Sequence, residues 1–161
     1  MKKKNVYLIT SGALIASFYV LLTLLARVFG LDSGTIQLRL SEALTILPVF
    51  TPAAIPGLFV GCIISNLLCG AIFWDIIFGS LATLIGAIGT YLLRRHRGLS
   101  PIPPIIANTL IIPFVLAFAY GYEGTIPFFM LTVGVGEILS CGVLGLIFMR
   151  AVEKIEHKIK W

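Results

Sequence analysis

The stretch IQLRLSEALTILP, residues 36–48, is the most informative part of this chain. It places Arg39 and Glu42 three residues apart inside an otherwise apolar segment. Three residues is close to one helical turn, so the two side chains are expected on one face of a helix, where they can form an ion pair. In hydrocarbon a buried charge costs at least about 2.5 kcal/mol and usually marks a site. The stretch therefore predicts either a structural ion pair or part of a binding site.

The composition is typical of an integral membrane protein. The 161 residues are 58% hydrophobic and only 12% charged, and several apolar runs exceed the roughly 18 residues needed to cross a bilayer. This length favours a single membrane domain, residues 1–161, without a separate catalytic or nucleotide-binding domain. Cys62, Cys69 and Cys141 lie in apolar segments without Cys-x-x-Cys spacing. We expect them to be packing residues rather than disulfides or metal ligands.

The apolar runs predict an all-α, compact bundle of six transmembrane helices. The second run is short for a full crossing and meets Pro48, Pro52 and Pro56, so we expect a short, tilted or partly re-entrant helix followed by a turn. Pro113 should kink the fifth helix. The predicted spans are approximately residues 6–28, 36–50, 55–73, 76–93, 105–120 and 126–149.

The distribution of Lys and Arg predicts the orientation of the bundle. Ten of the twelve Lys and Arg residues lie in Lys2–Lys4, Arg94–Arg97 and Arg150–Lys160. Because cytoplasmic loops are enriched in these residues, both termini are predicted to be cytoplasmic. The net charge of +5 is then explained by membrane topology, and we expect no binding to nucleic acid.

Acidic and amide side chains inside the spans are the first candidate ligand contacts. Glu137 lies roughly 16 Å below the outer end of the sixth span at 1.5 Å per residue, and an acid at that depth must be protonated, paired or next to a polar cavity. Asn66 and Asn108 offer amides that both donate and accept hydrogen bonds. Helix-to-helix hydrogen bonds would explain these two amides equally well.

Three further candidates lie near the outer interface: Trp74, Asp75 and Tyr120. The aromatic residues could line a pocket or belong to an ordinary interfacial belt. Acids, amides and aromatic rings together suit a planar, nitrogen-rich ligand that is neutral or cationic. Enzyme signatures are missing from the sequence, and its two histidines, His96 and His157, fall in predicted cytoplasmic regions. We therefore expect a binding protein without catalytic residues, metal or cofactor.

The first span carries two overlapping pairs of small residues, Gly12 with Ala16 and Ala13 with Ser17. This small-x-x-x-small spacing lets another helix approach closely in lipid. The spacing alone does not say whether that helix belongs to the same chain or to another protein.

With these features the chain resembles the QueT family of substrate-binding (S) components of energy-coupling factor (ECF) transporters. The resemblance rests on the six-span plan, on Arg-Leu-Ser-Glu-Ala-Leu-x-x-Leu-Pro at residues 39–48, and on Asp-Ile-Ile-Phe-Gly-Ser-Leu-Ala-Thr-Leu-Ile-Gly-Ala at residues 75–87. It implies capture of a queuosine precursor, a 7-deazaguanine such as preQ0, preQ1 or queuine. It also implies a transmembrane coupling protein that docks on the small residues of the first span, and two ATPase subunits that hydrolyse ATP.

The resemblance also implies roles for the candidate residues. Glu137 or Asp75 would accept hydrogen bonds from the guanine-like edge, while Asn66 or Asn108 would contact the carbonyl side. Trp74 or Tyr120 would stack on the ring, and Arg39 with Glu42 would hold the outer loop as a lid or touch the ligand. Two other classes remain open: a self-contained proton- or ion-coupled transporter, and a membrane scaffold without a small ligand.

Overall fold

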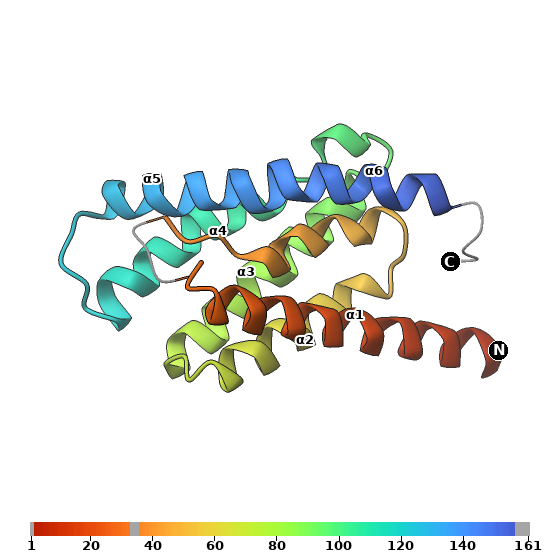
Figure 1. The fold of residues 1–161 in the computed structure, drawn as a ribbon, viewed down its shortest axis with the longest axis horizontal. Helices are drawn as coiled ribbons and strands as arrows, with labels where there is room; N and C mark the ends of the chain where they lie inside the picture. The colour runs from red at the N-terminus through yellow and green to blue at the C-terminus, as the bar shows by residue number, and fades with distance from the viewer. Residues whose placement is uncertain (1, 33–35, 157–161) are drawn as a thin grey trace.

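The computed structural model describes residues 2–32 and 36–156, and all of the regular structure in that part of the chain is helical (Figure 1). His157, Lys158 and Lys160 of the predicted cytoplasmic tail lie outside the described residues. The elements are α1 (Lys2–Val28), η1 (Leu40–Val49), α2 (Ala54–Leu68), α3 (Phe73–Leu92), η2 (Arg97–Leu99), α4 (Ile102–Phe114), η3 (Val115–Ala119), α5 (Ile126–Glu137), η4 (Ile138–Leu144) and α6 (Gly145–Glu156). Among these elements, η1 and η2 are 3₁₀ helices, and η3 and η4 are π-helical.

The all-α prediction is confirmed, but the two short helices differ from their predicted spans. Four helical stretches are long and apolar enough to cross a membrane: Asn5–Val28, Phe73–Leu92, Arg97–Ala119 and Ile126–Ile155. The second predicted span becomes helical only at Leu40. The third ends at Leu68 rather than near residue 73, because Gly70 adopts a φ of +69° and turns the chain. In the described part of the chain, the apolar helices Leu40–Val49 and Ala54–Leu68 are therefore shorter than a full crossing.

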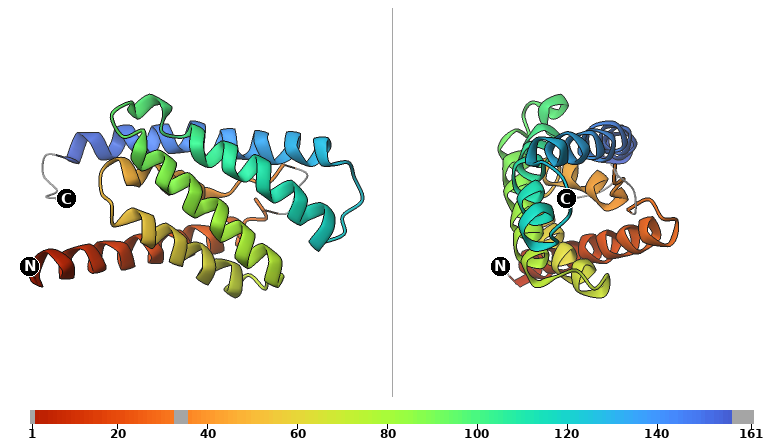
Figure 2. Two further views of the ribbon diagram at one scale, coloured as in Figure 1. Left: turned by 180° about the vertical axis from the view of Figure 1, so that it is seen from behind. Right: turned by 90° about the vertical axis from the view of Figure 1, so that its left-hand side faces the viewer.

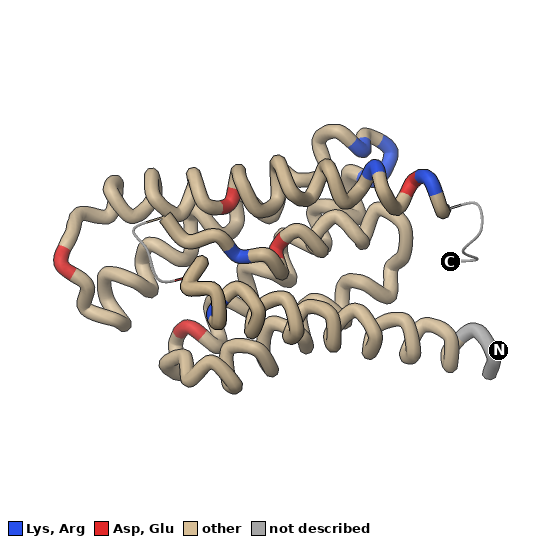
Figure 3. Tube along the Cα trace, in the orientation of Figure 1, with Lys and Arg blue, Asp and Glu red and all other residues tan. Residues whose placement is uncertain are grey.

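The bundle has an apolar outside and a partly polar centre. Large apolar side chains such as Leu14, Phe118 and Leu131 are exposed on its surface, whereas Glu42 and Asn108 are fully buried. The helices run roughly along one axis (Figure 2), and α1 begins at the same end of the bundle where α6 ends (Figure 1). Most of the Lys and Arg positions that Figure 3 colours gather at that end. This distribution of polarity is that of a protein surrounded by lipid.

The element at the centre is η1, which is packed against α1, α2, α3, η4 and α6. Leu44, Ile46 and Leu47 of η1 join a core that includes Ile15 from α1 and Leu58 from α2. A ten-residue 3₁₀ helix is unusual, because runs longer than three or four residues are uncommon. Neighbours on every side hold η1 in place, and the stretch that the sequence singled out lies in the middle of the fold.

Small residues bring α1 and α2 into close contact. A Cβ added to Gly57 would lie 2.6 Å from the Gly12 carbonyl oxygen, and one added to Gly61 would lie 3.0 Å from the Cα of Ala16. Gly12 and Ala16 therefore face α2 inside the chain. Their neighbours Ala13 and Ser17 are exposed on the outer face of α1.

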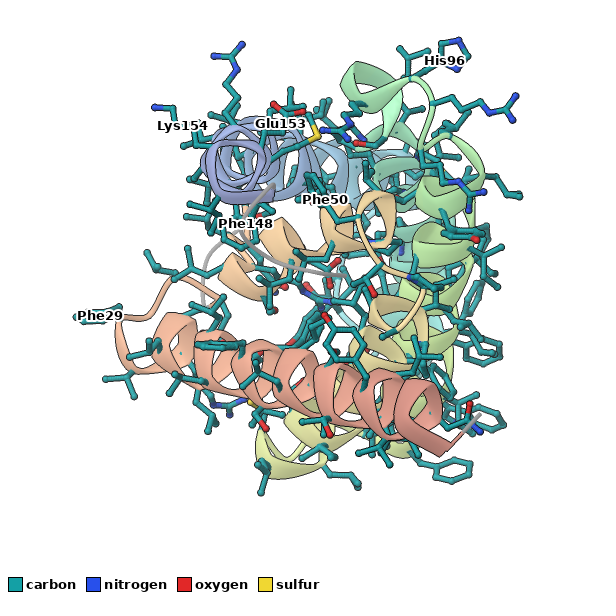
Figure 4. All side chains as sticks on the ribbon, turned by 90° about the vertical axis from the view of Figure 1, so that its right-hand side faces the viewer. Phe29, Phe50, His96, Phe148, Glu153 and Lys154 are labelled. Carbon is teal, nitrogen blue, oxygen red and sulfur yellow. The ribbon has the colours of Figure 1, made fainter. Side chains whose placement is uncertain are left out.

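The end of the bundle where α1 begins is tied together by Arg97. Its guanidinium forms an ion pair of 3.0 Å with Glu153 on α6 and lies 5.1 Å from the centre of the Phe50 ring, which follows η1. Figure 4 views the bundle from this side, with Phe50 close to α6 and His96 pointing away from the helices. The contacts of Arg97 fix the end of η1 against α6.

Candidate ligand-binding site

A cavity of about 550 Å³, which we call the outer cavity, lies at the opposite end of the bundle from the start of α1. The last turns of α1 and α2, the first turn of α3, the segment before η1 and the end of η3 surround it. Its polar and aromatic lining residues are Tyr19, Thr23, Arg27, Asp32, Gln37, Arg39, Ser41, Ser65, Asn66, Asp75, Tyr120 and Tyr122.

Three of the predicted site residues meet in the wall of the outer cavity. The Tyr120 hydroxyl donates a hydrogen bond of 2.9 Å to Asp75 Oδ2, and the Asn66 side chain donates one of 3.4 Å to the Asp75 carbonyl oxygen. Burial and the adjacent Asp75 carboxylate raise the pKa of Tyr120 to about 12, so its hydroxyl keeps the proton that it donates. Gly79 leaves room for this group, because a Cβ there would lie 3.2 Å from Asp75 Oδ1.

Arg39 lines the outer cavity but does not form the predicted ion pair with Glu42. Within the described residues the structure contains one ion pair, between Arg97 and Glu153. Arg39 precedes η1 with extended backbone (φ −94°, ψ 94°), so the helical spacing that suggested the pair does not apply. Glu42 instead accepts a hydrogen bond from Tyr19, and the Arg39 backbone N–H donates to Ser140 Oγ at 3.0 Å.

A second cavity of about 110 Å³, the inner cavity, adjoins the first and contains Glu137 in its wall. Gln37, Arg39 and Tyr122 line both cavities. The segment before η1 runs directly against α5, because a Cβ on Gly136 would collide with the Gln37 carbonyl oxygen. This close approach positions Arg39 between the two cavities.

Glu42 and Asn108 lie behind the cavities rather than in them. Both are 0% exposed, and neither lines the outer or the inner cavity. Glu42 groups with Glu137, which is 4% exposed, and Cys141, which is 0% exposed. Asn108 interacts with both carboxyl groups, and we call these four residues the buried cluster. Glu137 belongs both to this buried cluster and to the wall of the inner cavity.

Trp74 is also outside the outer cavity. Its side chain is 54% exposed and stacks on Phe78 with 6.0 Å between the ring centres. It lines a separate apolar groove of about 420 Å³ beside α4 and η3. This position matches the interfacial belt that the sequence left open as the alternative for the aromatic residues.

The sequence reasoning missed Tyr19, which lines the outer cavity and at the same time hydrogen-bonds Glu42. Its signal is a hydroxyl in the middle of a long apolar span, because a polar group at that depth needs a partner inside the bundle.

Comparison with known proteins gives two matches. The family model described as the QueT transporter matches residues 9–154. A curated protein of Lactococcus lactis subsp. cremoris (strain MG1363), named queuosine precursor transporter QueT, is 36% identical over 99 residues. Those residues are 60% of this chain and 57% of the relative, so the match spans little more than half of the relative's length. No solved structure matches the chain significantly.

The family match runs from the first turns of α1 into α6 and therefore includes both cavities and the buried cluster. The helices of the matched region are long and apolar enough for several membrane crossings. The chain is thus a multi-pass membrane protein that belongs to the QueT transporter family.

Proposed function

We propose that this chain is the substrate-binding (S) component of an ECF importer and that the outer cavity captures a queuosine precursor, a 7-deazaguanine. The observation that carries the proposal is the group formed by Asp75, Asn66 and Tyr120 in a cavity of about 550 Å³. That volume is within the range of about 300–1,000 Å³ that is common for small-molecule sites.

The chemistry of this group matches the ligand. The Tyr120 hydroxyl already donates a hydrogen bond to Asp75 Oδ2, and among the described residues no side chain donates to Oδ1. A 7-deazaguanine presents adjacent N–H donors beside a carbonyl oxygen, so its donors can reach Oδ1 while Asn66 or Arg39 donates to the carbonyl. The rings of Tyr19 and Tyr120 offer apolar faces to the planar base.

Glu137 has a different role in this proposal. It lines the inner cavity, beyond Arg39, and is therefore separated from the base-reading group around Asp75. A substituent that extends from the base past Arg39 would meet the Glu137 carboxyl group. The ammonium of preQ1 is such a substituent, and a carboxylate is its natural acceptor.

The proposed orientation places the outer cavity on the outside of the cell. Most of the Lys and Arg positions that Figure 3 colours gather at the opposite end of the bundle, and such residues are enriched on the cytoplasmic side. The single membrane domain of residues 1–161 would then have both termini in the cytoplasm. A transmembrane coupling protein would bind the exposed Ala13 and Ser17 of α1, and two ATPase subunits would supply the energy.

Calorimetry on the detergent-solubilised protein tests the substrate class. The titrants are preQ1, preQ0, queuine and thiamine as an unrelated vitamin. We expect one deazaguanine to bind with saturable heat and thiamine to give none; a folded sample without heat from any deazaguanine would contradict the proposal. Proteoliposomes that contain only this chain should not accumulate the ligand. Accumulation driven by an ion gradient would favour a self-contained transporter, for which the buried acids Glu42 and Glu137 would be the relay.

A further inference from the structure

Four side chains from four different elements converge in the buried cluster. Glu42 comes from η1, Asn108 from α4, Glu137 from the end of α5 and Cys141 from η4. The ligand-type atoms of Glu42, Glu137 and Cys141 all lie within 4.8 Å of one another. Two carboxyl groups so close together in a lipid-embedded bundle repel each other when ionised, and each loses its hydration. Either a bound proton or a cation must therefore neutralise the pair.

Some polar atoms of the cluster have protein partners and others have none: Cys141 Sγ lies within hydrogen-bond distance of Glu137 Oε2 and of the Glu42 carbonyl oxygen. Glu42 Oε2 and both amide atoms of Asn108 are buried without a hydrogen-bond partner. The Asn108 amide lies near enough to the carboxyl groups of both Glu42 and Glu137 to interact with them, although neither contact has the geometry of a hydrogen bond. Buried polar atoms are normally paired, and an Asn that is 0% exposed with two unpaired atoms indicates a missing partner at this place.

The missing partner is more readily a cation than an organic ligand. The atoms that converge are lone-pair donors: carboxyl oxygens, an amide oxygen and a sulfur atom. Glu42, Asn108 and Cys141 line neither the outer nor the inner cavity, so an organic ligand in those cavities would not reach them, whereas a bare ion needs only the ligand atoms themselves. Glu137 reaches the inner cavity and offers the ion a route of entry.

The spacing and the donor set point to a transition metal. Ligand atoms around a tetrahedral Zn²⁺, with bonds of about 2.1 Å to oxygen and 2.3 Å to sulfur, lie roughly 3.6 Å apart. Cys141 Sγ lies 3.2 Å from Glu137 Oε2, which needs only a small adjustment to match. Mg²⁺ and Ca²⁺ prefer oxygen ligands throughout, whereas a thiolate with carboxylates suits Zn²⁺ and similar ions.

We propose that Glu42, Asn108, Glu137 and Cys141 form a binding site for one divalent transition-metal ion, such as Zn²⁺, at the centre of the bundle. Binding displaces the Cys141 proton to solvent and leaves three anionic ligands on the ion. The remaining negative charge is balanced by Arg39, which is electrostatically coupled to Glu42 and Glu137. The Tyr19 hydroxyl holds the other oxygen of Glu42 and orients it toward the ion.

Cobalt is the best probe for this site, because a Co²⁺–thiolate bond gives a near-ultraviolet charge-transfer band that carboxylates alone do not produce. The full chain is purified in detergent, stripped of metal with a chelator and titrated with Co²⁺ alone, then with Zn²⁺ as a competitor. We expect one Co²⁺ per chain, a charge-transfer band that Zn²⁺ removes, and a higher unfolding temperature in the presence of either ion.

Matched variants locate the ion. Cys141→Ser should abolish the charge-transfer band, and Glu42→Gln should weaken Co²⁺ binding at least tenfold. Cys62→Ser and Cys69→Ser are the controls, since both are free cysteines outside the buried cluster, and both should keep the band. Size-exclusion chromatography verifies that each variant is folded.

Two results would overturn the proposal. The first is a folded wild-type chain that takes up no stoichiometric Co²⁺ or Zn²⁺, a measurement that does not depend on any variant. The second is a charge-transfer band that survives Cys141→Ser and disappears in Cys69→Ser, which would place the metal adventitiously at the outer cavity. Because no deazaguanine enters these titrations, their outcome is separate from that of the substrate-binding experiment.

Discussion

Tyr19 in α1 donates a hydrogen bond to Glu42 in η1, and its ring forms part of the wall of the outer cavity. One side chain thus contacts both the proposed substrate space and the buried cluster. Glu42 is 0% exposed, and its other oxygen has no hydrogen-bond partner.

Tyr19→Phe should destabilise the protein by about 1–3 kcal/mol, because it leaves a fully buried carboxyl group without a donor. Thermal unfolding in detergent measures the change. Tyr91→Phe is the control: Tyr91 is partly exposed, and its ring, which lies 4.1 Å from the Arg94 guanidinium, is retained. Equal unfolding temperatures for the two variants would show that the Tyr19 hydroxyl does not contribute measurably to the stability of the fold.

Asp75→Asn should weaken binding of the preferred deazaguanine by about 1–3 kcal/mol, roughly 5- to 150-fold, because the second acceptor oxygen becomes a donor. The asparagine oxygen can still accept from Tyr120, so the cavity wall is preserved. Calorimetric dissociation constants provide the measurement. Glu123→Gln is the matched control, because it also removes an acidic group but lies in the exposed loop before α5. Its ligand affinity should stay within twofold of wild type. An unchanged constant for Asp75→Asn would remove this residue from the site.

Trp74→Ala should leave ligand affinity unchanged, because the indole stacks on Phe78 and lines the groove outside the outer cavity. Tyr120→Ala, by comparison, removes a ring from the cavity wall and the donor to Asp75, and should weaken binding clearly. Calorimetry on both variants separates the interfacial aromatic from the cavity aromatic. A larger loss for Trp74→Ala than for Tyr120→Ala would contradict this assignment.

Gly57→Ala should destabilise the bundle by about 1–3 kcal/mol through overpacking of α1 against α2. The added Cβ would lie 2.6 Å from the Gly12 carbonyl oxygen, and backbone on both sides leaves little room to adjust. Gly98→Ala is the control, since a Cβ there meets nothing within 4 Å. Thermal unfolding of the two variants in the same detergent measures the difference, and a Gly57→Ala protein as stable as wild type would show that α1 can shift.

Ala13→Leu should leave the unfolding temperature unchanged, because Ala13 is exposed on the outer face of α1. It should nevertheless reduce co-purification with the proposed transmembrane coupling protein, since a bulky side chain prevents close helix approach. Ala151→Leu, at an exposed alanine on α6, is the matched control and should retain the partner. Full retention by Ala13→Leu would place the docking surface elsewhere.

The helical fold could be predicted from the sequence because each long helix corresponds to a long, continuous apolar run. The apolar runs around α1 and α3 are continuous, and lipid leaves few alternatives to a helix. The segment before η1 was harder, because Arg39 is held in extended backbone by Ser140, which lies 101 residues away in the chain. Helical spacing cannot reveal a contact of that kind.

The site was predicted only in part for a related reason. Asp75, Asn66 and Tyr120 were found as polar or aromatic groups near one interface, and the structure brings them together. Trp74 is adjacent to Asp75 in the sequence but lies on another face of α3, and lipid-facing and ligand-facing aromatic residues have the same composition signal. Whether a given face of a helix borders a cavity depends on how all the neighbouring helices pack, and the sequence of that helix alone does not contain this information.

The central position of η1 has a consequence for how the molecule is made. Ten residues of 3₁₀ helix cannot hold their shape alone, and two of the elements packed around η1, η4 and α6, belong to the last part of the chain. During synthesis Arg39 and Glu42 therefore leave the ribosome long before their surroundings exist. The cavities beside η1 can therefore take their final shape only when α6 has been inserted, and the proposed ligand would bind the completed bundle and not a shorter nascent form.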